Sequence, residues 1–220
     1  MKKKRLDPIR GIYAIVDPLG RPERSPVALA RSALQAGARV LQLRAKDLST
    51  RERVALAREI SELCRGHKVL FIVNDRLDVA LAAEADGVHL GQDDLPLPAA
   101  RRVAGDRLLI GVSSHSAAEA MQAEKEGADY LGFGALYATT SKDKVTRPQG
   151  TARLLEVARA IRIPVIAIGG ITLEKLEEIH AAGAAGAAVI GAWVQAGDPE
   201  AALGAMVHAW QKLDKRNHPA

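Results

Sequence analysis

Short apolar runs alternate with longer segments of helical spacing along nearly the whole chain. Eight runs of four or five residues, rich in Val, Ile and Leu, predict buried β-strands. They lie at 12–16, 40–43, 69–73, 87–90, 108–112, 130–134, 164–168 and 187–190. Eight strands alternating with helices in a chain of 220 residues predict an α/β fold, a single (β/α)₈ TIM barrel.

The segments between the runs carry helix start and stop signals. Ser49 with Glu52, and Ser116 with Glu119, have the spacing of a capping box at a helix N-terminus. Glycine-containing tripeptides just ahead of three runs predict helix ends, at 36–38, 126–128 and 182–184. The helices therefore fill the intervals that a barrel requires.

The competing fold is an open, doubly wound sheet. Such a sheet normally carries a glycine-rich turn after its first strand, whereas here the first run is followed by Asp-Pro-Leu-Gly at 17–20. No linker or low-complexity segment divides the chain, so we predict one domain over 1–220. Within it we expect a basic tail at 1–10 and an active-site loop at 136–150.

Composition narrows the class of protein. No apolar run approaches the roughly 20 residues of a membrane span, and the basic start Met-Lys-Lys-Lys-Arg lacks the apolar stretch of a signal peptide. Cys64 is the only cysteine, which excludes an intrachain disulfide and favours a cytoplasmic location. The net charge of +5 comes with only 3% aromatic residues, which argues against nucleic acid and favours small phosphorylated substrates.

In such a barrel, functional residues gather where the strands end. The run at 69–73 ends in Asn74 and Asp75, and the next run is followed by the doublet Asp93 and Asp94. Two carboxylates from adjacent strand ends suit a hard cation such as Mg²⁺. The simpler interpretation is that Asp75 caps a helix and that the doublet lies in a turn.

Cationic side chains mark two other strand ends. Gln42, Arg44 and Lys46 alternate along the end of one run, so they share a face that could capture an anion. Lys142 follows Thr-Thr-Ser in the long loop, a combination that suits phosphate binding and closure over a substrate. Both groups also fit ordinary solvated charges.

Glycine and histidine residues are further candidates for the site at the predicted strand ends. Gly169, Gly170 and Gly191 end the last two strands just before helices, where backbone N–H groups form phosphate sites, although plain turns also use glycine. His89 is expected inside the barrel, and His115 could reach the pocket for proton transfer. The sequence carries no zinc motif and no Ser–His–Asp pattern.

Six motifs follow one another in order between about Gly11 and Ala202. They are Gln-Leu-Arg-Ala-Lys at 42–46, Val-Asn-Asp-Arg at 73–76, Ala-Asp-Gly-Val-His-Leu-Gly-Gln-Asp-Asp at 85–94, Gly-Val-Ser-Ser-His at 111–115, Gly-Ala-Asp-Tyr-Leu-Gly-Phe-Gly at 127–134 and Ala-Ile-Gly-Gly-Ile at 167–171. Together they resemble the thiamine-phosphate synthase family. The resemblance implies a transferase that joins 4-amino-2-methyl-5-hydroxymethylpyrimidine diphosphate to thiazole phosphate, or its carboxylate. The products are thiamine phosphate and pyrophosphate, formed by Mg²⁺-assisted dissociative substitution without a protein nucleophile.

The resemblance also implies roles for residues at the matching positions. The pyrimidine diphosphate would be held by Gln42, Arg44, Lys46, Asn74, Ser113 and Lys142. Of these, the catalytic residues would be Arg44, Lys46, Ser113 and Lys142. Asp75 and Asp94 would bind Mg²⁺. The thiazole phosphate would be bound by Thr139, Thr140, Ser141, Gly170, Ile190 and Gly191.

The chain departs from the family pattern at two points of the thiazole half. Its loop reads Ala-Thr-Thr-Ser-Lys at 138–142 where the family has Pro-Thr-x-Thr-Lys, and Gly191 stands where the family has serine. One lost hydrogen bond is worth about 1 kcal/mol, which is severalfold in affinity. The competing functions are a metal-free thiazole tautomerase that would use His115, and a non-catalytic barrel that binds a thiamine intermediate. A homo-oligomer is compatible with the sequence.

Overall fold

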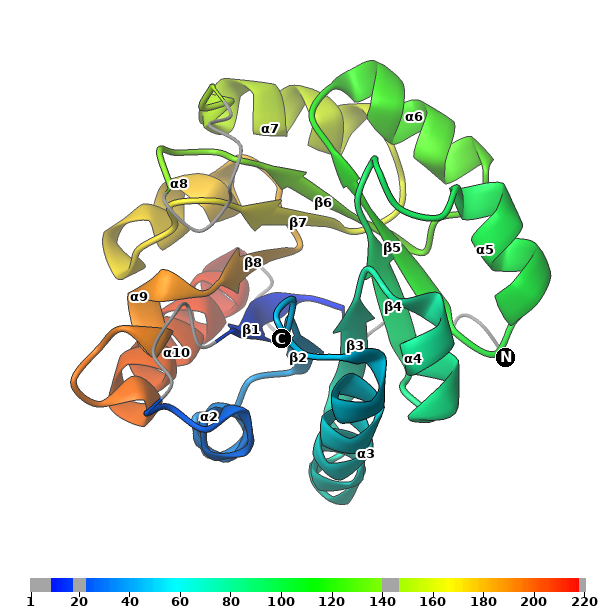
Figure 1. Ribbon diagram of the computed structural model, residues 1–220. Coiled ribbons are helices and arrows are strands. Elements are labelled where there is room, and N and C mark those ends of the chain that lie inside the picture. Colours follow the sequence, from blue (N-terminus) through cyan, green and yellow to red (C-terminus); the bar gives the residue numbers. More distant parts are fainter. Residues whose placement is uncertain (1–8, 18–22, 140–146, 218–220) are drawn as a thin grey trace.

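The computed structural model describes residues 9–17, 23–139 and 147–217, and its strands form one closed parallel barrel (Figure 1). The strands are β1 (Gly11–Val16), β2 (Val40–Leu43), β3 (Leu70–Asn74), β4 (Gly87–Leu90), β5 (Leu109–Ser114), β6 (Tyr130–Gly134), β7 (Val165–Ile168) and β8 (Gly186–Val189). All eight predicted strands are confirmed, with ends within two residues of the prediction. The barrel closes because β1 pairs in parallel with both β2 and β8, so the open-sheet alternative is wrong.

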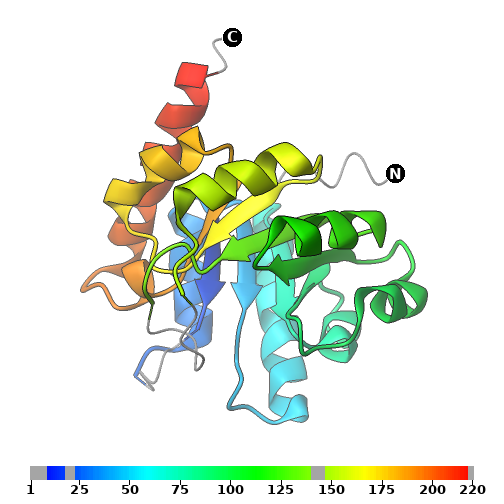
Figure 2. The same cartoon turned by 90° about the horizontal axis from the view of Figure 1, so that it is seen from above.

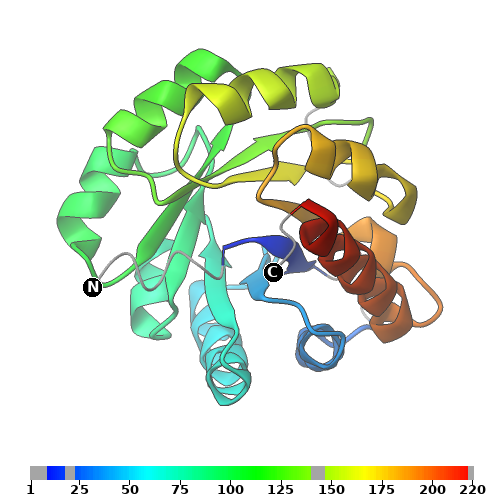
Figure 3. The ribbon, with the colours of Figure 1, turned by 180° about the vertical axis from the view of Figure 1, so that it is seen from behind.

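Helices surround the barrel on its outer side, as Figure 1 and the rear view in Figure 3 show. They are α2 (Pro26–Gln35), α3 (Thr50–His67), α4 (Leu77–Ala82), α5 (Leu97–Ala104), α6 (Ala117–Lys125), α7 (Gly150–Ala160), the 3₁₀ turn η1 (Leu173–Lys175), α8 (Leu176–Ala181), α9 (Gly191–Val194) and α10 (Pro199–Asn217). The last helix, α10, lies beside α2, α8 and β1, and its Trp210 is buried. Among the described residues, none of these helices is long and apolar enough to cross a membrane.

The local signals in the sequence explain where several helices begin and end. Ser49 and Glu52 form the predicted reciprocal cap of α3, with hydrogen bonds of 3.3 Å and 2.9 Å between side chain and backbone. At α6, Ser116 accepts from the Glu119 N–H as predicted, but the Glu119 carboxylate accepts from the His115 N–H instead. The glycines in the three predicted stop tripeptides all adopt positive φ values.

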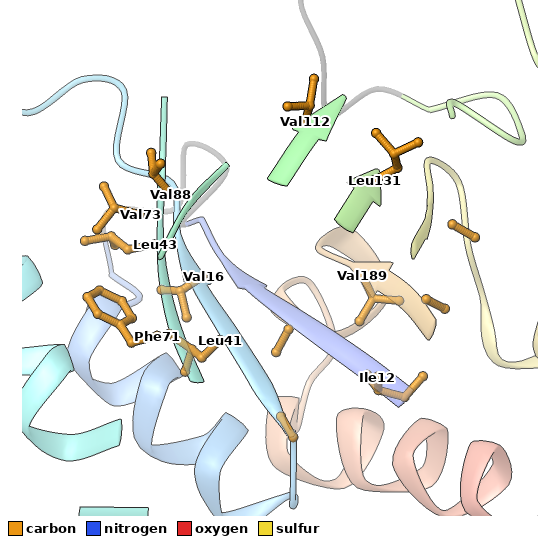
Figure 4. Packing of buried hydrophobic residues seen from close by; sticks show 14 of the residues in the cluster. Ile12, Val16, Leu41, Leu43, Phe71, Val73, Val88, Val112, Leu131 and Val189 are labelled. Atoms are coloured by element: carbon orange, nitrogen blue, oxygen red, sulfur yellow. The ribbon is translucent and has the colours of Figure 1, made fainter. Parts of the chain in front are cut away.

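Side chains of each strand alternate between two apolar layers. The outward ones pack against the helices in one large core, to which Val16, Leu43, Val73, Val88 and Val112 belong (Figure 4). Cys64 belongs to the same core, and burial raises the pKa of its thiol to about 12, so Cys64 is a packed residue rather than a nucleophile. The outer layer is mostly apolar, with Ser114 as a polar exception, whereas Gln42 and Ser113 are directed to the barrel interior and its rim.

The inward side chains form a second, smaller core inside the barrel. Its members include Ile15, Val40, Ile72, Leu109 and Ile166. Figure 2 shows the ribbon of the barrel and its surrounding helices turned by 90° from Figure 1. The strands are all parallel, so their carboxyl ends and the loops that follow them share one rim of the barrel. Every described residue that the sequence proposed for the site belongs to this rim or to the barrel interior just beneath it.

Candidate active site

Two adjoining cavities open at the carboxyl rim. The smaller holds about 70 Å³ and is lined by Gln42, Arg44, Asn74 and Ser113 among others. The larger holds about 500 Å³ and lies at the ends of β6, β7 and β8. Ile168, Ala188 and Ile190 line both cavities, so two ligands bound there would be neighbours.

The smaller cavity is bordered by cations that the ends of β1–β3 bring together. The Arg44 guanidinium forms an ion pair with Asp17, which directly follows β1 and is 7% exposed. The Lys46 ammonium lies 3.7 Å from the Asp75 carboxylate. An arginine with a planar fork and a lysine with a mobile point charge are together suited to the oxygens of a diphosphate.

Asp75 and Asp94 meet at the same rim although they follow different strands. Asp75 adopts a left-handed conformation with φ of 63°, and its N–H donates to the His89 carbonyl of β4 at 2.8 Å. Its carboxyl is hydrogen-bonded to that of Asp94. The Asp94 carboxylate in turn accepts from the Gly91 N–H at 2.6 Å, which fixes the turn after β4.

The carboxyl pair carries an electrostatic cost that a cation would remove. Burial, and then the neighbouring charge and hydrogen bond of Asp94, raise the pKa of Asp75 from 3.8 to about 6, and Lys46 and Arg44 oppose the rise only partly. A hydrogen bond between two carboxyl groups needs one shared proton, and a divalent cation can take the place of that proton. Asp75 does not cap α4, whose N-cap is Arg76 without a side-chain hydrogen bond, so the simpler interpretation of Asp75 is wrong.

The ligand set fits magnesium better than a metal held entirely by protein. Within the described part of the chain, no group of three or more His, Cys, Asp or Glu side chains could hold a metal ion. Two carboxylate ligands leave most of an octahedral shell to water and substrate phosphate, which is how Mg²⁺ is commonly bound. Asp75 and Asp94 are therefore the residues that could hold such an ion.

The larger cavity is lined mostly by backbone and small side chains. Gly169 and Gly170 both have positive φ values, and a Cβ on Gly170 would lie 2.4 Å from the Ala138 carbonyl oxygen. Thr139, Ile190 and Gly191, to which the family resemblance gives a role in thiazole-phosphate binding, also line this cavity. Gly191 begins α9, whose first N–H groups lie at the cavity wall.

Lys175 is a cation of this cavity that the sequence did not single out. Its ammonium donates to the Gly170 carbonyl at 3.2 Å and lies 3.7 Å from the centroid of the Tyr137 ring. The Tyr137 hydroxyl donates to Glu178, which orients the ring beneath the ammonium. Among the described residues that line the cavity, Lys175 is the cation; it lies beside the glycine wall and is suited to an anionic group.

Lys175→Gln is expected to raise the KM for a phosphorylated ligand of the larger cavity by about tenfold, because one charge-assisted hydrogen bond is lost. The KM for the other substrate is expected to stay within about twofold. Steady-state kinetics with each substrate varied in turn measures both. Lys125→Gln, an exposed lysine in the last turn of α6, is the matched control, and equal rises in both KM values would contradict the assignment.

The remaining sequence-based candidates have different outcomes. Thr140, Ser141 and Lys142 lie outside the described residues, so their predicted roles stay predictions. His89 is confirmed as an interior residue, with its ring hydrogen-bonded to Tyr130 and Ser113. His115 is 3.4 Å from Glu119 on the first turn of α6.

Asp17 also escaped the sequence interpretation, although a usable signal existed. It is the first residue after β1, and the rule that strand ends supply the site applied to it as to Asp75. Lys175 had no such signal, because it lies five residues beyond Gly170 in a turn and resembles any other of the 31 lysines and arginines.

The fold and these cavities define a (β/α)₈-barrel enzyme with room for two anionic ligands side by side. Residues 12–193 match the family model for thiamine monophosphate synthase, and the chain belongs to this family. The predicted family membership is confirmed.

Individual relatives agree with the family model. The chain is 51% identical over 190 residues to the thiamine-phosphate synthase of Chlorobium phaeovibrioides, covering 86% of this chain and 91% of that protein. It is 47% identical over 192 residues to the thiamine-phosphate synthase of Methanospirillum hungatei, covering 87% and 93%. A solved thiamine phosphate pyrophosphorylase from Pyrococcus furiosus superposes with a TM-score of 0.85 at 37% identity, covering 92% of this chain and 96% of that one.

Proposed function

We propose that the protein is a thiamine-phosphate synthase, a transferase that condenses 4-amino-2-methyl-5-hydroxymethylpyrimidine diphosphate with thiazole phosphate or its carboxylate. The observation that carries the proposal is the wall of Ile168, Ala188 and Ile190 that the two cavities share. Ligands in the two cavities have their rings adjacent at the barrel mouth, as a condensation requires. The products are thiamine phosphate and pyrophosphate.

In this proposal the smaller cavity and its rim hold the pyrimidine diphosphate. Gln42, Asn74 and Ser113 bind and orient the ring at the barrel mouth, where all three line the cavity. Arg44 and Lys46, together with Lys142, bind the diphosphate oxygens and stabilise the charge that grows as pyrophosphate departs. Mg²⁺ held by Asp75 and Asp94 would supply further charge neutralisation for this leaving group.

The larger cavity holds the thiazole phosphate. Gly170, Gly191 and Lys175 face the phosphate, with Thr139, Thr140 and Ser141 as hydroxyl donors and Ile190 against the ring. The bond between the pyrimidine methylene carbon and the diphosphate oxygen breaks, and pyrophosphate leaves with the electron pair. The thiazole nitrogen then donates its lone pair to the methylene carbon. The site residues position both partners, and no protein group becomes covalently attached.

Product analysis tests the proposal directly. The purified chain, incubated with both substrates and Mg²⁺, is expected to form thiamine phosphate and pyrophosphate in equal amounts, measured by mass spectrometry and a pyrophosphate assay. Isomerisation of a thiazole carboxylate phosphate alone, stopped by His115→Ala, would instead identify a tautomerase. Tight binding of both substrates without any product would identify a non-catalytic binding protein.

Metal binding is expected to depend on pH through Asp75. Its pKa of about 6 means that a proton must leave before a cation binds at lower pH. The Kd for Mg²⁺, measured by calorimetry with pyrophosphate present, is therefore expected to be flat above about pH 7 and to rise about tenfold per pH unit below pH 6. In Asp75→Asn this dependence is expected to disappear together with most of the affinity. A Kd for the wild-type chain that stays constant from pH 5 to pH 8 is the opposite result.

The proposal also covers the location, partners and domain organisation that the sequence predicts. The enzyme acts on small phosphorylated molecules in the cytoplasm, without a nucleic-acid or membrane partner. It forms one domain over 1–220, with 136–150 as the active-site loop and 1–10 as a basic tail. Sedimentation of the purified chain measures whether it assembles into a homo-oligomer.

A further inference from the structure

A continuous chain of hydrogen bonds crosses the barrel interior beneath the smaller cavity. The Gln42 Nε2 donates to the Tyr13 hydroxyl at 2.8 Å, and that hydroxyl lies 2.9 Å from the Tyr130 hydroxyl. His89 continues the chain, with its Nδ1 3.2 Å from the Tyr130 hydroxyl and its Nε2 3.0 Å from the Ser113 Oγ. We call these five residues the interior relay. Both of its ends, Gln42 and Ser113, line the cavity.

The barrel wall is shaped around this relay. A Cβ on Gly111 would lie 2.1 Å from Cζ of Tyr130, and a Cβ on Gly132 would lie 3.0 Å from Cε1 of His89. Tyr13, Tyr130 and His89 also lie in tilted ring contact, with centroids 6.1 Å and 5.5 Å apart. The relay side chains are therefore held in place by packing as well as by hydrogen bonds.

The donor at one end and the burial of both phenols assign a direction to the protons of the relay. Tyr13 accepts from Gln42, and its buried proton is satisfied among the printed contacts only by donation to Tyr130. Tyr130 in turn donates to Nδ1 of His89, which leaves the histidine proton on Nε2 for Ser113. Both phenols stay protonated, since burial raises the pKa of Tyr13 and of Tyr130 above the ordinary value.

The direction of the relay sets what its two ends offer to a ligand. The hydrogen bond from Nε2 to Tyr13 fixes the orientation of the Gln42 amide, and with it the position of the carbonyl oxygen, which is an acceptor. Ser113 already accepts from His89, so its own proton is directed away from the histidine. The cavity wall thus combines one fixed acceptor with one fixed donor.

We propose that the interior relay makes the cavity select an aminopyrimidine over an oxopyrimidine, with Tyr13, Tyr130 and His89 as positioning residues. An aminopyrimidine offers an amino N–H donor and a ring-nitrogen acceptor, which complement the Gln42 oxygen and the Ser113 hydroxyl. The oxo form offers a carbonyl acceptor and a ring N–H donor, which is the reverse. This inference rests on the proposed function, because it takes the smaller cavity to be the pyrimidine site.

Tyr130→Phe tests the relay, since it removes the hydroxyl in the middle of the hydrogen-bonded series and keeps the aromatic ring. Tyr13 can then turn its proton to the Gln42 oxygen of a rotated amide, and His89 can take its proton on Nδ1 and accept from Ser113. Both ends become free to match either ring. Binding is measured by calorimetry, without thiazole phosphate, for the amino and oxo forms of the hydroxymethylpyrimidine monophosphate, which lack the pyrophosphate leaving group.

The wild-type chain is expected to bind the amino form about 50-fold more tightly, since two hydrogen bonds are reversed in the oxo form. In Tyr130→Phe the preference is expected to fall to about fivefold or less, and Tyr13→Phe provides a second cut if the first variant does not fold. Ser114→Ala is the matched control, because this neighbouring serine donates to the Ser116 carbonyl outside the barrel interior. It is expected to keep the wild-type preference.

Equal weakening of both ligands in Tyr130→Phe and Tyr13→Phe, with the preference unchanged, would overturn the relay and leave a merely structural role. If the preference is unchanged in these variants and the wild-type protein releases pyrophosphate from the two substrates, the proposed function stands without the relay. If the wild-type chain binds neither pyrimidine ester and releases no pyrophosphate, the proposed function and the relay both fail.

Discussion

Asp75→Asn is expected to lower kcat/KM for pyrophosphate release by about 10³-fold, and Asp94→Asn by a similar factor. Each substitution keeps the shape of the side chain and removes one of the two negative charges that meet at the ends of β3 and β4. The loss is expected mainly in kcat, because charge neutralisation matters most as pyrophosphate departs. Steady-state kinetics at saturating Mg²⁺ measures it.

Asp75→Asn is also expected to be more stable than the wild-type chain when both are compared at pH 8 without metal. The pKa of Asp75 lies above its ordinary value, so its ionisation in the folded state is penalised as the pH rises through about 6. After allowance for solvent screening of this part-exposed group, the gain in unfolding free energy is about 1–2 kcal/mol. Below about pH 3 this carboxyl is protonated in both the folded and the unfolded protein, and the gain is expected to vanish.

Asp93→Asn is the matched control for both effects. Asp93 precedes Asp94 in the same turn and is exposed, and the sequence already favoured Asp94 as the ligand. The control is expected to keep activity within about twofold and unfolding free energy within about 0.5 kcal/mol. If Asp93→Asn is as damaging as Asp94→Asn, the assignment of the ligand within the doublet is wrong.

Arg44→Met is expected to reduce both activity and stability. The ion pair between Arg44 and Asp17 is largely buried, so removal of the guanidinium leaves the Asp17 carboxylate without this partner. We expect a loss of about 2–4 kcal/mol in unfolding free energy and about 10²–10³-fold in kcat/KM. Urea denaturation and pyrophosphate release measure the two quantities separately.

A second substitution separates the two roles of Arg44. Asp17→Asn combined with Arg44→Met removes both charges, so stability is expected to return to within about 1 kcal/mol of the wild-type value. Activity is not expected to return, because the diphosphate still lacks its arginine. Recovery of activity in the double variant would mean that Arg44 only neutralises Asp17 and does not bind the diphosphate. Arg65→Met, which breaks an exposed pair with Glu84, is expected to leave both quantities nearly unchanged.

The strands were predictable because a parallel barrel buries them on both faces. Each therefore appears as a short continuous apolar run, and the carboxyl-end rule then selects the rim residues. Arg44, Asn74 and Asp75 follow from that rule alone, whereas Ser113 was assigned through the family resemblance. The reciprocal cap at Ser49 was also local in sequence and was confirmed.

The contacts within the site were harder to predict from the sequence, because they depend on how segments that are distant in the chain approach one another. The hydrogen bond between Asp75 and Asp94 needs the left-handed turn at Asp75 and its backbone bond to His89. Alternation along β1 and β6 predicts that Tyr13 and Tyr130 point inward, but their pairing follows from barrel closure across 117 residues of sequence. Lys175 lies in a turn without any strand pattern.

Pyrophosphate release by the purified chain, with each component omitted in turn, tests the central claim most directly. The claim is that two adjoining cavities and a carboxylate pair perform one metal-assisted condensation. Release is expected only when the pyrimidine diphosphate, the thiazole phosphate and Mg²⁺ are all present, and it is expected to stop when a chelator removes the metal. Undiminished condensation without any divalent metal would contradict the role of Asp75 and Asp94. Release at the full rate without the thiazole phosphate would contradict the joint use of the two cavities.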